Sequence, residues 1–577
     1  MMNNYIRGGQ LFLHKMRMLN QVWDKSLIAS FFVALIITSY LTYDQYAKLD
    51  YAAGITYVKA ITVIQVDKAF SKNGTSKITA ASNKGIYAKS MTAKDVLSHK
   101  GFKAKYNEIS STLVKSTLLM LGVMLGIFTF VILIWTKFGK LAGEKDIIKG
   151  GKILNAKDVA RFLNKAHKAS HFIVGGAPLV KDSETSHILI TGTTGSGKTT
   201  CMNEILPQIR KNNQPAIVID CNGSMTQKYY DSSRGDMIIG SYNDPLSDEC
   251  CSWDFWEDAA DEHNLAIIAN SLFADKGGGY DEMWNNSAKQ FFKDAVKYVM
   301  KEAIAQGAEP SMKSLYQLLA HDSLSDVAKK LKGYASASIL DPKNDKTAMS
   351  VRTNTIAFID WMENFHETDN KCSISKWFSQ LVQNKENPAK ISGRWFFLRS
   401  FPKQRVALRS FHSMLLDLSI NHLMELGEDP DRRIWMIIDE LPALKKLPSL
   451  SMALSEFRKY GGCIMASVQS PHQLFDIYGQ NMAYSMLDQF NTKFIFRTDE
   501  HNFASYLCKG FGDIEYKESS ENYSYGAHEM RDGVSFSMLE KKKALLSPAD
   551  LANLANLEAY MKLPESEIRL AKIKVSH

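Results

Sequence analysis

The chain has 577 residues, of which 45% are hydrophobic and 23% charged, the proportions of a folded protein with several domains. This composition excludes a disordered or low-complexity chain, and only seven cysteines exclude a scaffold built on disulfides. A net charge of +9 would suggest a nucleic-acid-binding protein. However, residues 1–150 hold 20 basic and 8 acidic residues, a net charge of +12, whereas residues 151–577 carry −3. The basic character therefore belongs to the N-terminal quarter.

Two stretches in this quarter are free of charged residues, residues 26–43 and residues 116–136. As helices they would be about 27 and 31 Å long, close to the ~30 Å hydrocarbon core of a bilayer. A cleaved signal peptide is the alternative for the first stretch, but its apolar part exceeds the usual ~7–15 residues. A buried core helix is the alternative for the second, which has more uncharged residues than such a helix needs. The sequence predicts two transmembrane helices.

The charges that flank these stretches predict the orientation of the chain. Basic residues precede the first stretch and follow the second: Arg7, Lys15, Arg17, Lys25, Lys137, Lys140, Lys145 and Lys149. Both ends are therefore expected in the cytoplasm, with residues 44–115 outside as a small domain that contains strand-like segments such as residues 61–66. All seven cysteines follow residue 200, in the cytosolic part, where reduced thiols are expected, and the absence of a CxxC pair argues against zinc.

A glycine-rich motif follows a short apolar strand at residues 187–191. GTTGSGKT, residues 192–199, fits the pattern GxxxxGK[ST] at every position. Glycines let backbone N–H groups wrap phosphates, Lys198 reaches the β- and γ-oxygens, and the Thr199 hydroxyl ligates Mg²⁺. The alternative, an ordinary glycine-rich turn, does not require a strand before it and a helix after it. The predicted nucleotide-binding residues are Gly192, Thr193, Thr194, Gly195, Ser196, Gly197, Lys198, Thr199 and Thr200.

A second apolar strand, residues 434–438, ends in Asp439 and Glu440. In a parallel sheet these carboxylates would lie beside the phosphate-binding motif. Asp439 is then predicted to hold Mg²⁺, and Glu440 is predicted to polarise the attacking water. Glu440 and Lys198 are the predicted catalytic residues. An exposed strand end is the alternative for this pair, and the phosphate-binding motif in the same chain argues against it.

Further short strands are predicted at residues 216–219, 237–239, 395–398, 463–468 and 493–496. Helical segments separate most of them, which is typical of an α/β fold with a parallel sheet. Gln469 ends one strand and is a candidate sensor of the γ-phosphate, or else a solvated strand end. Arg458, on the preceding helix, is a candidate arginine finger for a neighbouring subunit, or else a surface residue.

Asp439 lies 241 residues after Lys198, so a domain is inserted between them. Residues 257–370 have helical periodicity, most clearly over residues 282–306. Its predicted buried stripe is Trp284, Ala288, Phe291, Ala295 and Val299. Its lysines at four-residue spacing form one band: Lys289, Lys293, Lys297 and Lys301. This lysine band is either a solvated helix face or a surface that contacts DNA phosphates.

Several stretches resemble type IV coupling proteins, and more narrowly the TraD family of F-type conjugation systems. They are DELPALKKLPSL at 439–450, RKYGG at 458–462, QS at 469–470, YSYGA at 523–527, RDGV at 531–534 and CSWDFW within 250–256. The resemblance implies a RecA-like P-loop ATPase domain with an inserted all-helical domain, preceded by two transmembrane helices. The expected parts are a cytoplasmic N-terminus (1–25), a first span (26–43), a periplasmic domain (44–115), a second span (116–136), the ATPase domain (150–256 and 371–577) and the helical insertion (257–370).

The resemblance also implies an inner-membrane homohexamer that hydrolyses ATP with Mg²⁺. It would receive relaxase-bound single-stranded DNA from the relaxosome and pass it to a type IV secretion channel, whose inner-membrane scaffold the periplasmic domain would contact. Arg458 matches the family's candidate trans arginine finger, and Gln469 matches its sensor glutamine.

Two features depart from the family. The family usually has an acidic residue in the turn after the strand that ends at Asp220, where this chain has DCNGS at 220–224. F-type members also carry a C-terminal tail that recognises a relaxosome protein, and this sequence ends at residue 577, so docking by a tail is not expected.

Three other functions fit the motifs: a coupling ATPase for protein effectors, an FtsK-like DNA translocase, and a receptor that uses nucleotide only to assemble.

Overall fold

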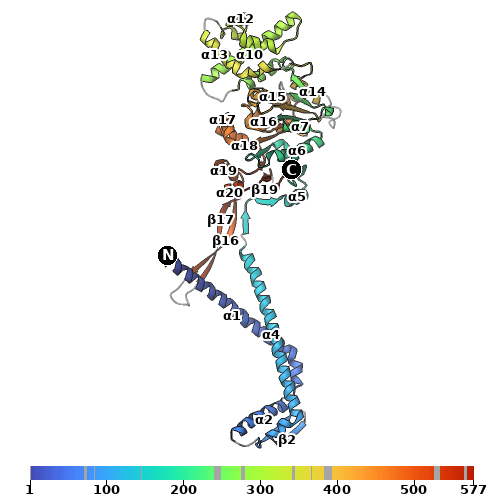
Figure 1. The fold of residues 1–577 in the computed structure, drawn as a ribbon, viewed down its shortest axis with the longest axis vertical. Coiled ribbons are helices and arrows are strands. Elements are labelled where there is room, and N and C mark those ends of the chain that lie inside the picture. The colour runs from blue at the N-terminus through green and yellow to red at the C-terminus, as the bar shows by residue number, and fades with distance from the viewer. Residues whose placement is uncertain are drawn as a thin grey trace. The chain divides into compact units, whose positions relative to one another are not determined.

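The computed structural model describes residues 2–70, 74–83, 85–143, 146–239, 249–274, 280–340, 345–365, 367–382, 393–524, 533–564 and 568–576. The chain divides into two compact units (Figure 1). The N-terminal unit holds residues 1–146 and 517–539, and the sheet unit holds residues 147–516 and 540–577. Lys145, residues 525–527 and residues 531–532, which entered the sequence predictions, lie outside the described residues.

Two long helices, α1 (Met2–Ala47) and α4 (Lys100–Gly143), dominate the N-terminal unit. By length and composition, Leu19–Ala47 and Lys100–Lys137 could each cross a membrane. The helices pack together through the rings of Trp23 and Phe128, whose centroids are 5.0 Å apart. Apolar side chains of α4 such as Leu125 and Leu133 are 64% and 67% exposed, and lipid would remove that surface from water. Both predicted apolar helices are present and extend beyond their predicted bounds.

Between these helices lie α2 (Tyr51–Ala69), β1 (Lys77–Ser82), β2 (Gly85–Thr92) and α3 (Ala93–Ser98). The prediction of a strand at residues 61–66 is wrong, because this segment lies within α2. Its β-branched residues favour a strand locally, but small residues at helical spacing bury one face of α2. At Gly54 a Cβ would come within 2.4 Å of Ile109 on α4, so close helix packing has overridden the local preference.

The sheet unit is built on twelve strands in the order β11-β10-β9-β12-β8-β13-β14-β7-β15-β18-β19-β4. Strands β11 to β15 of this order are mutually parallel, whereas β18 is antiparallel to both its neighbours. In sheet order the strands are β11 (Lys371–Cys372), β10 (Cys250–Trp253), β9 (Met237–Ile239), β12 (Trp395–Arg399), β8 (Ala216–Asp220), β13 (Ile434–Ile438), β14 (Gly462–Val468), β7 (Ile188–Thr191), β15 (Thr492–Ile495), β18 (Glu558–Lys562), β19 (Ile568–Lys574) and β4 (Lys152–Asn155). All the strands that the sequence predicted within the sheet unit are present.

The central strands are buried on both faces, which explains their nearly continuous apolar sequences. Side chains alternate between two cores: Ala216 and Val218 pack with α6 (Lys198–Lys211), whereas Ile217 and Ile219 pack with α15 (Arg405–Glu425) and α16 (Leu450–Tyr460). The polar side chains that follow these strands therefore emerge at one edge of the sheet, between two helical layers.

Further helices and strands complete the sheet unit. The helices are α5 (Ala156–Lys165), α7 (Ser224–Tyr229), α14 (Ile374–Val382), α17 (Pro471–Tyr478), α18 (Gln480–Gln489), α19 (His501–Lys509) and α20 (Pro548–Ala552). Strands β5 (Ala169–Val174) and β6 (Ala177–Val180) pair with each other. A further sheet is formed by β3 (Asp146–Lys149), β16 (Asp513–Ser524) and β17 (Gly533–Ala544), whose residues are divided between the two units.

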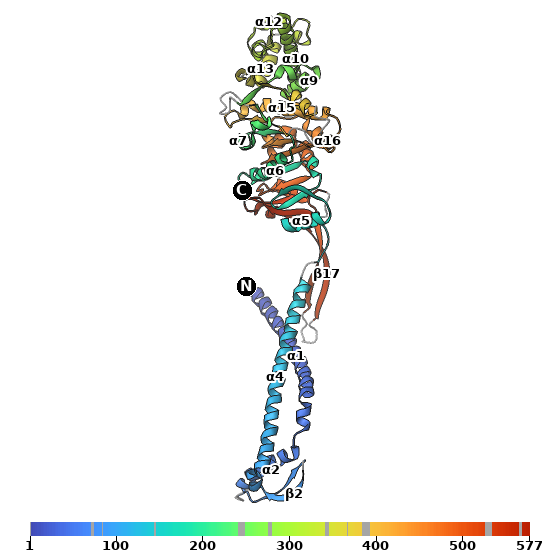
Figure 2. The same cartoon turned by 90° about the vertical axis from the view of Figure 1, so that its right-hand side faces the viewer.

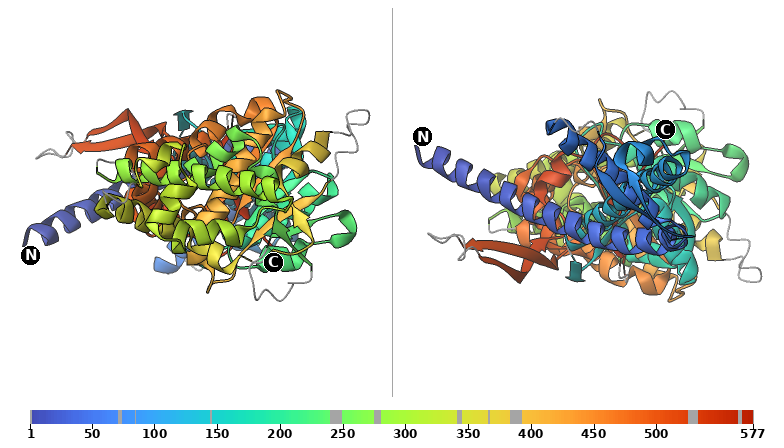
Figure 3. Two further views of the ribbon diagram at one scale, coloured as in Figure 1. Left: turned by 90° about the horizontal axis from the view of Figure 1, so that it is seen from above. Right: turned by 90° about the horizontal axis from the view of Figure 1, so that it is seen from below.

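In the described residues between β10 and β11, every regular element is helical. The helices are α8 (Phe255–Asp258), α9 (Glu262–Leu272), α10 (Tyr280–Gln306), α11 (Met312–Tyr316), α12 (Leu324–Lys330) and α13 (Asp345–Ile359). They gather at one end of the sheet unit (Figure 2), and in the view from above they lie in front of part of it (Figure 3, left). On α10 the predicted buried stripe packs into the core, with Trp284 only partly buried. The inserted helical domain is therefore present.

The chain leaves for the insertion after β10 and returns at β11, two neighbouring parallel strands. Buried Asp258 links the two chain segments that connect the sheet to the insertion. It accepts hydrogen bonds from Trp253 Nε1 (2.7 Å) and from the backbone N–H of Ile374 (2.9 Å). Cys251 and Cys372, 121 residues apart, form a disulfide here with a Cα–Cα distance of 5.9 Å. The expectation that all seven cysteines are reduced is therefore wrong for this pair, because strand pairing brings together thiols that show no motif in the sequence.

Candidate functional site

The phosphate loop, residues 192–199, connects β7 to the N-terminus of α6. Its backbone needs glycine at three positions, because φ is +151° at Gly192, +74° at Gly195 and +122° at Gly197. A Cβ at Gly192 would also lie 2.6 Å from the Cβ of Phe496, and one at Gly197 would lie 2.9 Å from the ring of the same residue. The loop is thus an open turn of backbone that ends at the positive pole of α6, an arrangement suited to binding phosphate.

Lys198 occupies the mouth of this loop. Its Nζ donates hydrogen bonds to the carbonyl oxygens of Gly192 (2.8 Å) and Thr193 (3.1 Å). Burial lowers the pKa of Lys198, and the negative charges of Glu440 and Asp439 oppose this shift. Of the other predicted nucleotide-binding residues, Thr194, Gly195 and Thr199 are exposed, while Thr193 and Thr200 are partly buried. Thr194, Gly195 and Thr199 are therefore the parts of the loop open to a ligand, next to the nearly buried Lys198.

Asp439 and Glu440 follow β13 at the same edge of the sheet. Burial raises the pKa of Asp439 to about 6, helped by the charge of nearby Asp220, while Lys198 acts in the opposite direction. Burial also raises the pKa of Glu440 to about 7. A carboxylate with a pKa near neutrality is suited to accept a proton from water.

Gln469 follows β14, which lies between β7 and β13 in the sheet. Its Oε1 accepts a hydrogen bond from the Thr194 hydroxyl (3.1 Å), and its backbone N–H donates to Glu440 Oε1 (3.4 Å). It is thus the residue that contacts both the phosphate loop and the predicted catalytic carboxylate. Gln469 is also exposed, so the sensor role and the solvated strand end both stay predictions.

Three further residues at this edge were not recognised as site residues from the sequence. Asp220 ends β8, Asn222 lies in the turn after it, and Arg405 begins α15. Asn222 Nδ2 donates to Asp439 Oδ2 (3.3 Å), and its Oδ1 accepts a hydrogen bond from Arg405 Nη2. Arg405 is 183 residues from Asn222 in sequence, so no local pattern could have indicated the pair.

The residues at this edge of the sheet fit a nucleoside triphosphate and Mg²⁺. The glycine backbone leaves a cradle that side chains would fill, and the Thr199 hydroxyl and Asp439 carboxylate are the hard oxygen donors that Mg²⁺ prefers. Among the described residues no group of three His, Cys, Asp or Glu side chains could hold a metal alone.

Arg458 and the lysine band lie on helices outside this cluster. Arg458 is exposed on α16, where an arginine that serves a neighbouring subunit would have to be. On α10, Lys301 is exposed, Lys289 and Lys293 are partly buried, and Lys297 forms an ion pair with Glu262. The band is therefore continuous on α10, with part of its charge already balanced by Glu262.

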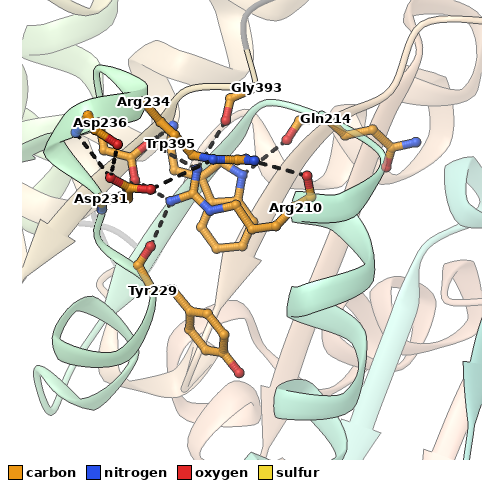
Figure 4. Close-up of polar contacts among 9 residues, drawn as sticks. Arg210, Gln214, Tyr229, Asp231, Arg234, Asp236, Gly393 and Trp395 are labelled. Carbon is orange, nitrogen blue, oxygen red and sulfur yellow. Dashed lines mark hydrogen bonds and ion pairs between the residues drawn. The ribbon is translucent and has the colours of Figure 1, made fainter.

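The far end of α6 is anchored by a buried ion pair (Figure 4). Arg210 Nη1 donates to Asp236 Oδ1 (3.0 Å) and to the carbonyl oxygen of Gly393 (3.0 Å), and its Nη2 also pairs with Asp236. The guanidinium carbon lies 3.8 Å from the ring centroid of Trp395. Asp236 accepts a further hydrogen bond from the Trp395 backbone N–H (2.8 Å). These contacts bind α6 to the starts of β9 and β12 and so fix the helix whose other end forms the phosphate loop.

Comparison of this sequence with models of known protein families shows to which family the chain belongs. Residues 171–576 match the model of the type IV secretion-system coupling protein DNA-binding domain, which is more than half of the chain. The chain belongs to the type IV secretion-system coupling protein family. It is 29% identical to coupling protein TraD of Escherichia coli strain K12 over 568 residues, 97% of this chain and 76% of TraD. The resemblance stated from the sequence motifs is thereby confirmed.

Solved structures of the bacterial conjugative coupling protein TrwB have the same fold. The unbound form of TrwB lacking its first 70 residues superposes with a TM-score of 0.62 at 23% identity, covering 75% of this chain and 94% of TrwB. TrwB in complex with ADP and Mg²⁺ gives a TM-score of 0.61 at 23% identity, covering 75% and 95%. The predicted fold class, a RecA-like ATPase domain with an inserted helical domain after two apolar helices, is confirmed.

Proposed function

We propose that this protein is an ATP-hydrolysing coupling protein of the bacterial inner membrane, which passes relaxase-bound single-stranded DNA from the relaxosome to a type IV secretion channel. The observation that carries the proposal is the meeting of the phosphate loop, Asp439, Glu440 and Gln469 at one edge of the sheet. Membership of the coupling protein family supports the transport role, and the nucleotide complexes of TrwB support ATP and Mg²⁺ as its ligands.

In the proposed mechanism the loop backbone and Lys198 bind the phosphates. Thr199 and Asp439 would hold Mg²⁺, which would neutralise charge on the phosphate oxygens. Glu440 orients the attacking water and accepts its proton, and Gln469 links the phosphate loop to Glu440. Arg458 of a neighbouring subunit completes the site in a homohexamer.

The two apolar helices support a membrane anchor with both termini in the cytoplasm. In this arrangement the segment of α2, β1, β2 and α3 lies in the periplasm, where it would contact the inner-membrane scaffold of the channel. The basic residues before the first span and after the second are then on the cytoplasmic side.

The full chain in detergent is expected to hydrolyse ATP, with stimulation by single-stranded DNA. Lys198→Ala should lower the rate at least about 100-fold, because it removes the cation that faces the phosphates, and Glu440→Gln should do so by removing the base. Lys211→Gln, an exposed change at the other end of α6, is the matched control. Phosphate release measures the rate, and full activity of either Lys198→Ala or Glu440→Gln would contradict the proposal.

The pH dependence of hydrolysis follows from the raised pKa values of the Asp439 and Glu440 carboxyl groups. Glu440 and Asp439 must both be ionised to act, and their pKa values are raised to about 7 and about 6. We therefore expect kcat/KM for ATP with Mg²⁺ to fall as the pH drops through 7, and more steeply below 6. The measurement is the pH profile between 5.5 and 8.5, and a flat profile down to pH 5.5 is the contradicting result.

The lysine band gives a separate prediction about DNA. Replacing all four lysines (Lys289, Lys293, Lys297 and Lys301) by glutamine should weaken single-stranded DNA binding. It should also reduce the slope of log affinity against log salt by about 0.7 for each lysine that contacts a phosphate. Four exposed lysines elsewhere on the insertion, changed in the same way, provide the control: Lys313, Lys329, Lys332 and Lys346. An unchanged slope would make the band a solvated helix face.

A further inference from the structure

The turn between β8 and α7 has a shape fixed by one buried carboxylate. Asp220 is fully buried, and its Oδ2 accepts hydrogen bonds from the backbone N–H (2.7 Å) and the hydroxyl (2.8 Å) of Thr226. Its Oδ1 accepts from the backbone N–H of Asn222 (3.2 Å). With three donors around one carboxylate, the turn is held at both of its ends, and Asn222 is carried to the mouth of the candidate site.

The side-chain amide of Asn222 has one allowed orientation at this place. Arg405 Nη2 donates both to Asn222 Oδ1 and to the carbonyl oxygen of Cys221 (3.0 Å). A guanidinium can only donate, so the amide oxygen must face Arg405 and the NH₂ group must face away from it. The NH₂ group then donates to Oδ2 of Asp439 (3.3 Å). If the amide were flipped, its NH₂ group would face the N–H donors of Arg405, and its oxygen would face the carboxylate of Asp439. Neither contact could then be a hydrogen bond.

Asp439 needs this support because of its surroundings. It is 8% exposed, and the charge of Asp220 acts on it unfavourably, while the cations of Lys198 and Arg405 act favourably. Lys198 also serves the phosphates in the proposed function, so Arg405 is the cation that can stay with the carboxylate throughout. Side chains that hold a metal ligand in place commonly change metal affinity by about 10- to 100-fold when removed.

We propose that Asn222 and Arg405 are positioning residues of the Mg²⁺ site: Arg405 orients the Asn222 amide, and this amide holds, through Oδ2, the Asp439 carboxylate that would bind the ion. This inference rests on the proposed function, since it assigns Asp439 to Mg²⁺. It gives a role to the turn after Asp220, which lacks the acidic residue usual in the family, through an amide at a neighbouring position.

The proposal predicts an order of effects that a structural role alone would reverse. Asn222→Asp keeps the size of the side chain and its bond to Arg405, but it turns an acceptor oxygen toward Asp439, so two carboxylates would oppose each other. Asn222→Ala only removes the donor. If Asn222 merely shaped the turn, Asn222→Asp would be the milder change. If it positions Asp439, Asn222→Asp is the more harmful one.

The test measures binding of a fluorescent ATP analogue to the full chain in detergent, first in EDTA and then during Mg²⁺ titration. In EDTA, the variants should bind as the wild type does. The Mg²⁺ concentration at half-effect should rise about 10-fold for Asn222→Ala and Arg405→Gln, and about 100-fold for Asn222→Asp. Arg405→Lys, which still donates, should recover part of the loss. Lys403→Gln, an exposed loss of charge two residues from Arg405, should match the wild type.

The outcomes separate this inference from the proposed function. If Mg²⁺ strengthens nucleotide binding by the wild type and both Asn222 variants respond to Mg²⁺ as the wild type does, the inference is overturned and the proposed function stands. If Asn222→Asp is milder than Asn222→Ala, the positioning role is likewise overturned. If nucleotide binding by the wild type does not depend on Mg²⁺, the proposed Mg²⁺ site fails, and the inference fails with it.

Discussion

Replacing Arg458 by alanine is expected to lower kcat for ATP hydrolysis by about 10³-fold, with little change in nucleotide binding. Arg458 is exposed on α16, in a single chain that otherwise brings its predicted catalytic groups to one edge of the sheet. An arginine supplied by a neighbouring subunit stabilises charge that develops only in the transition state, and such residues contribute about 10³- to 10⁵-fold. The measurement is the steady-state ATPase rate, with ATP-analogue binding as the second readout.

A mixing experiment tests whether Arg458 acts on another subunit. Lys198→Ala subunits are expected to hydrolyse ATP very slowly but still present Arg458, whereas Arg458→Ala subunits keep an intact phosphate loop. Rings assembled from both variants should therefore recover hydrolysis at those interfaces where the first type faces the second. Lys459→Ala, an exposed neighbour on the same helix, is the control for surface charge. Mixed rings as inactive as either variant alone would contradict action in trans.

The second large effect is expected on stability. Asp236→Ala leaves the Arg210 guanidinium, 11% exposed, without its carboxylate at the end of α6. Breaking a buried ion pair by removing one partner destabilises a protein by about 3–5 kcal/mol, because an uncompensated charge stays buried. Thermal unfolding followed by tryptophan fluorescence measures the change, since Trp395 and Trp435 both donate to Gln214 beside this pair (3.0 and 2.7 Å).

Two further variants define what the loss means. Replacing both partners, with Arg210→Met and Asp236→Leu, should recover much of the stability, because no unpaired charge is then buried. Arg161→Gln, which breaks an exposed ion pair on α5, should leave the unfolding temperature unchanged. An Asp236→Ala protein as stable as the wild type would show that the anchor of α6 is redundant.

Much of the candidate site could be predicted from consecutive residues. The phosphate loop is recognisable because backbone curvature, charge and metal binding each require a particular residue at a set position within eight residues. The pair Asp439 and Glu440 is recognisable because an apolar strand precedes it. Gln469 could be placed at a strand end, but its contacts with Thr194 and Glu440 depend on β14 lying between β7 and β13.

The predictions that were wrong concern segments whose environment is remote in sequence. Residues 61–66 have the β-branched composition of a strand, yet they are helical because the small residues of α2 pack against α4. Cys251 and Cys372 were expected to be reduced, yet they meet because β10 and β11 are neighbours. In both cases a partner more than 40 residues away along the chain decides the outcome.

The amino-acid sequence alone predicts the two apolar helices, the alternation of strands and helices, and the glycine-rich loop between β7 and α6. Each of these depends on residues within one helix, strand or turn, where spacing is set by backbone geometry. The support of Asp439 depends instead on Asn222 and Arg405, which are 217 and 34 residues from it in sequence. Strand order brings them together: β8 lies beside both β13 and β12, the strand that precedes α15. Such contacts exist only once the sheet has formed, because side-chain packing between strands and helices remote in sequence selects the neighbours.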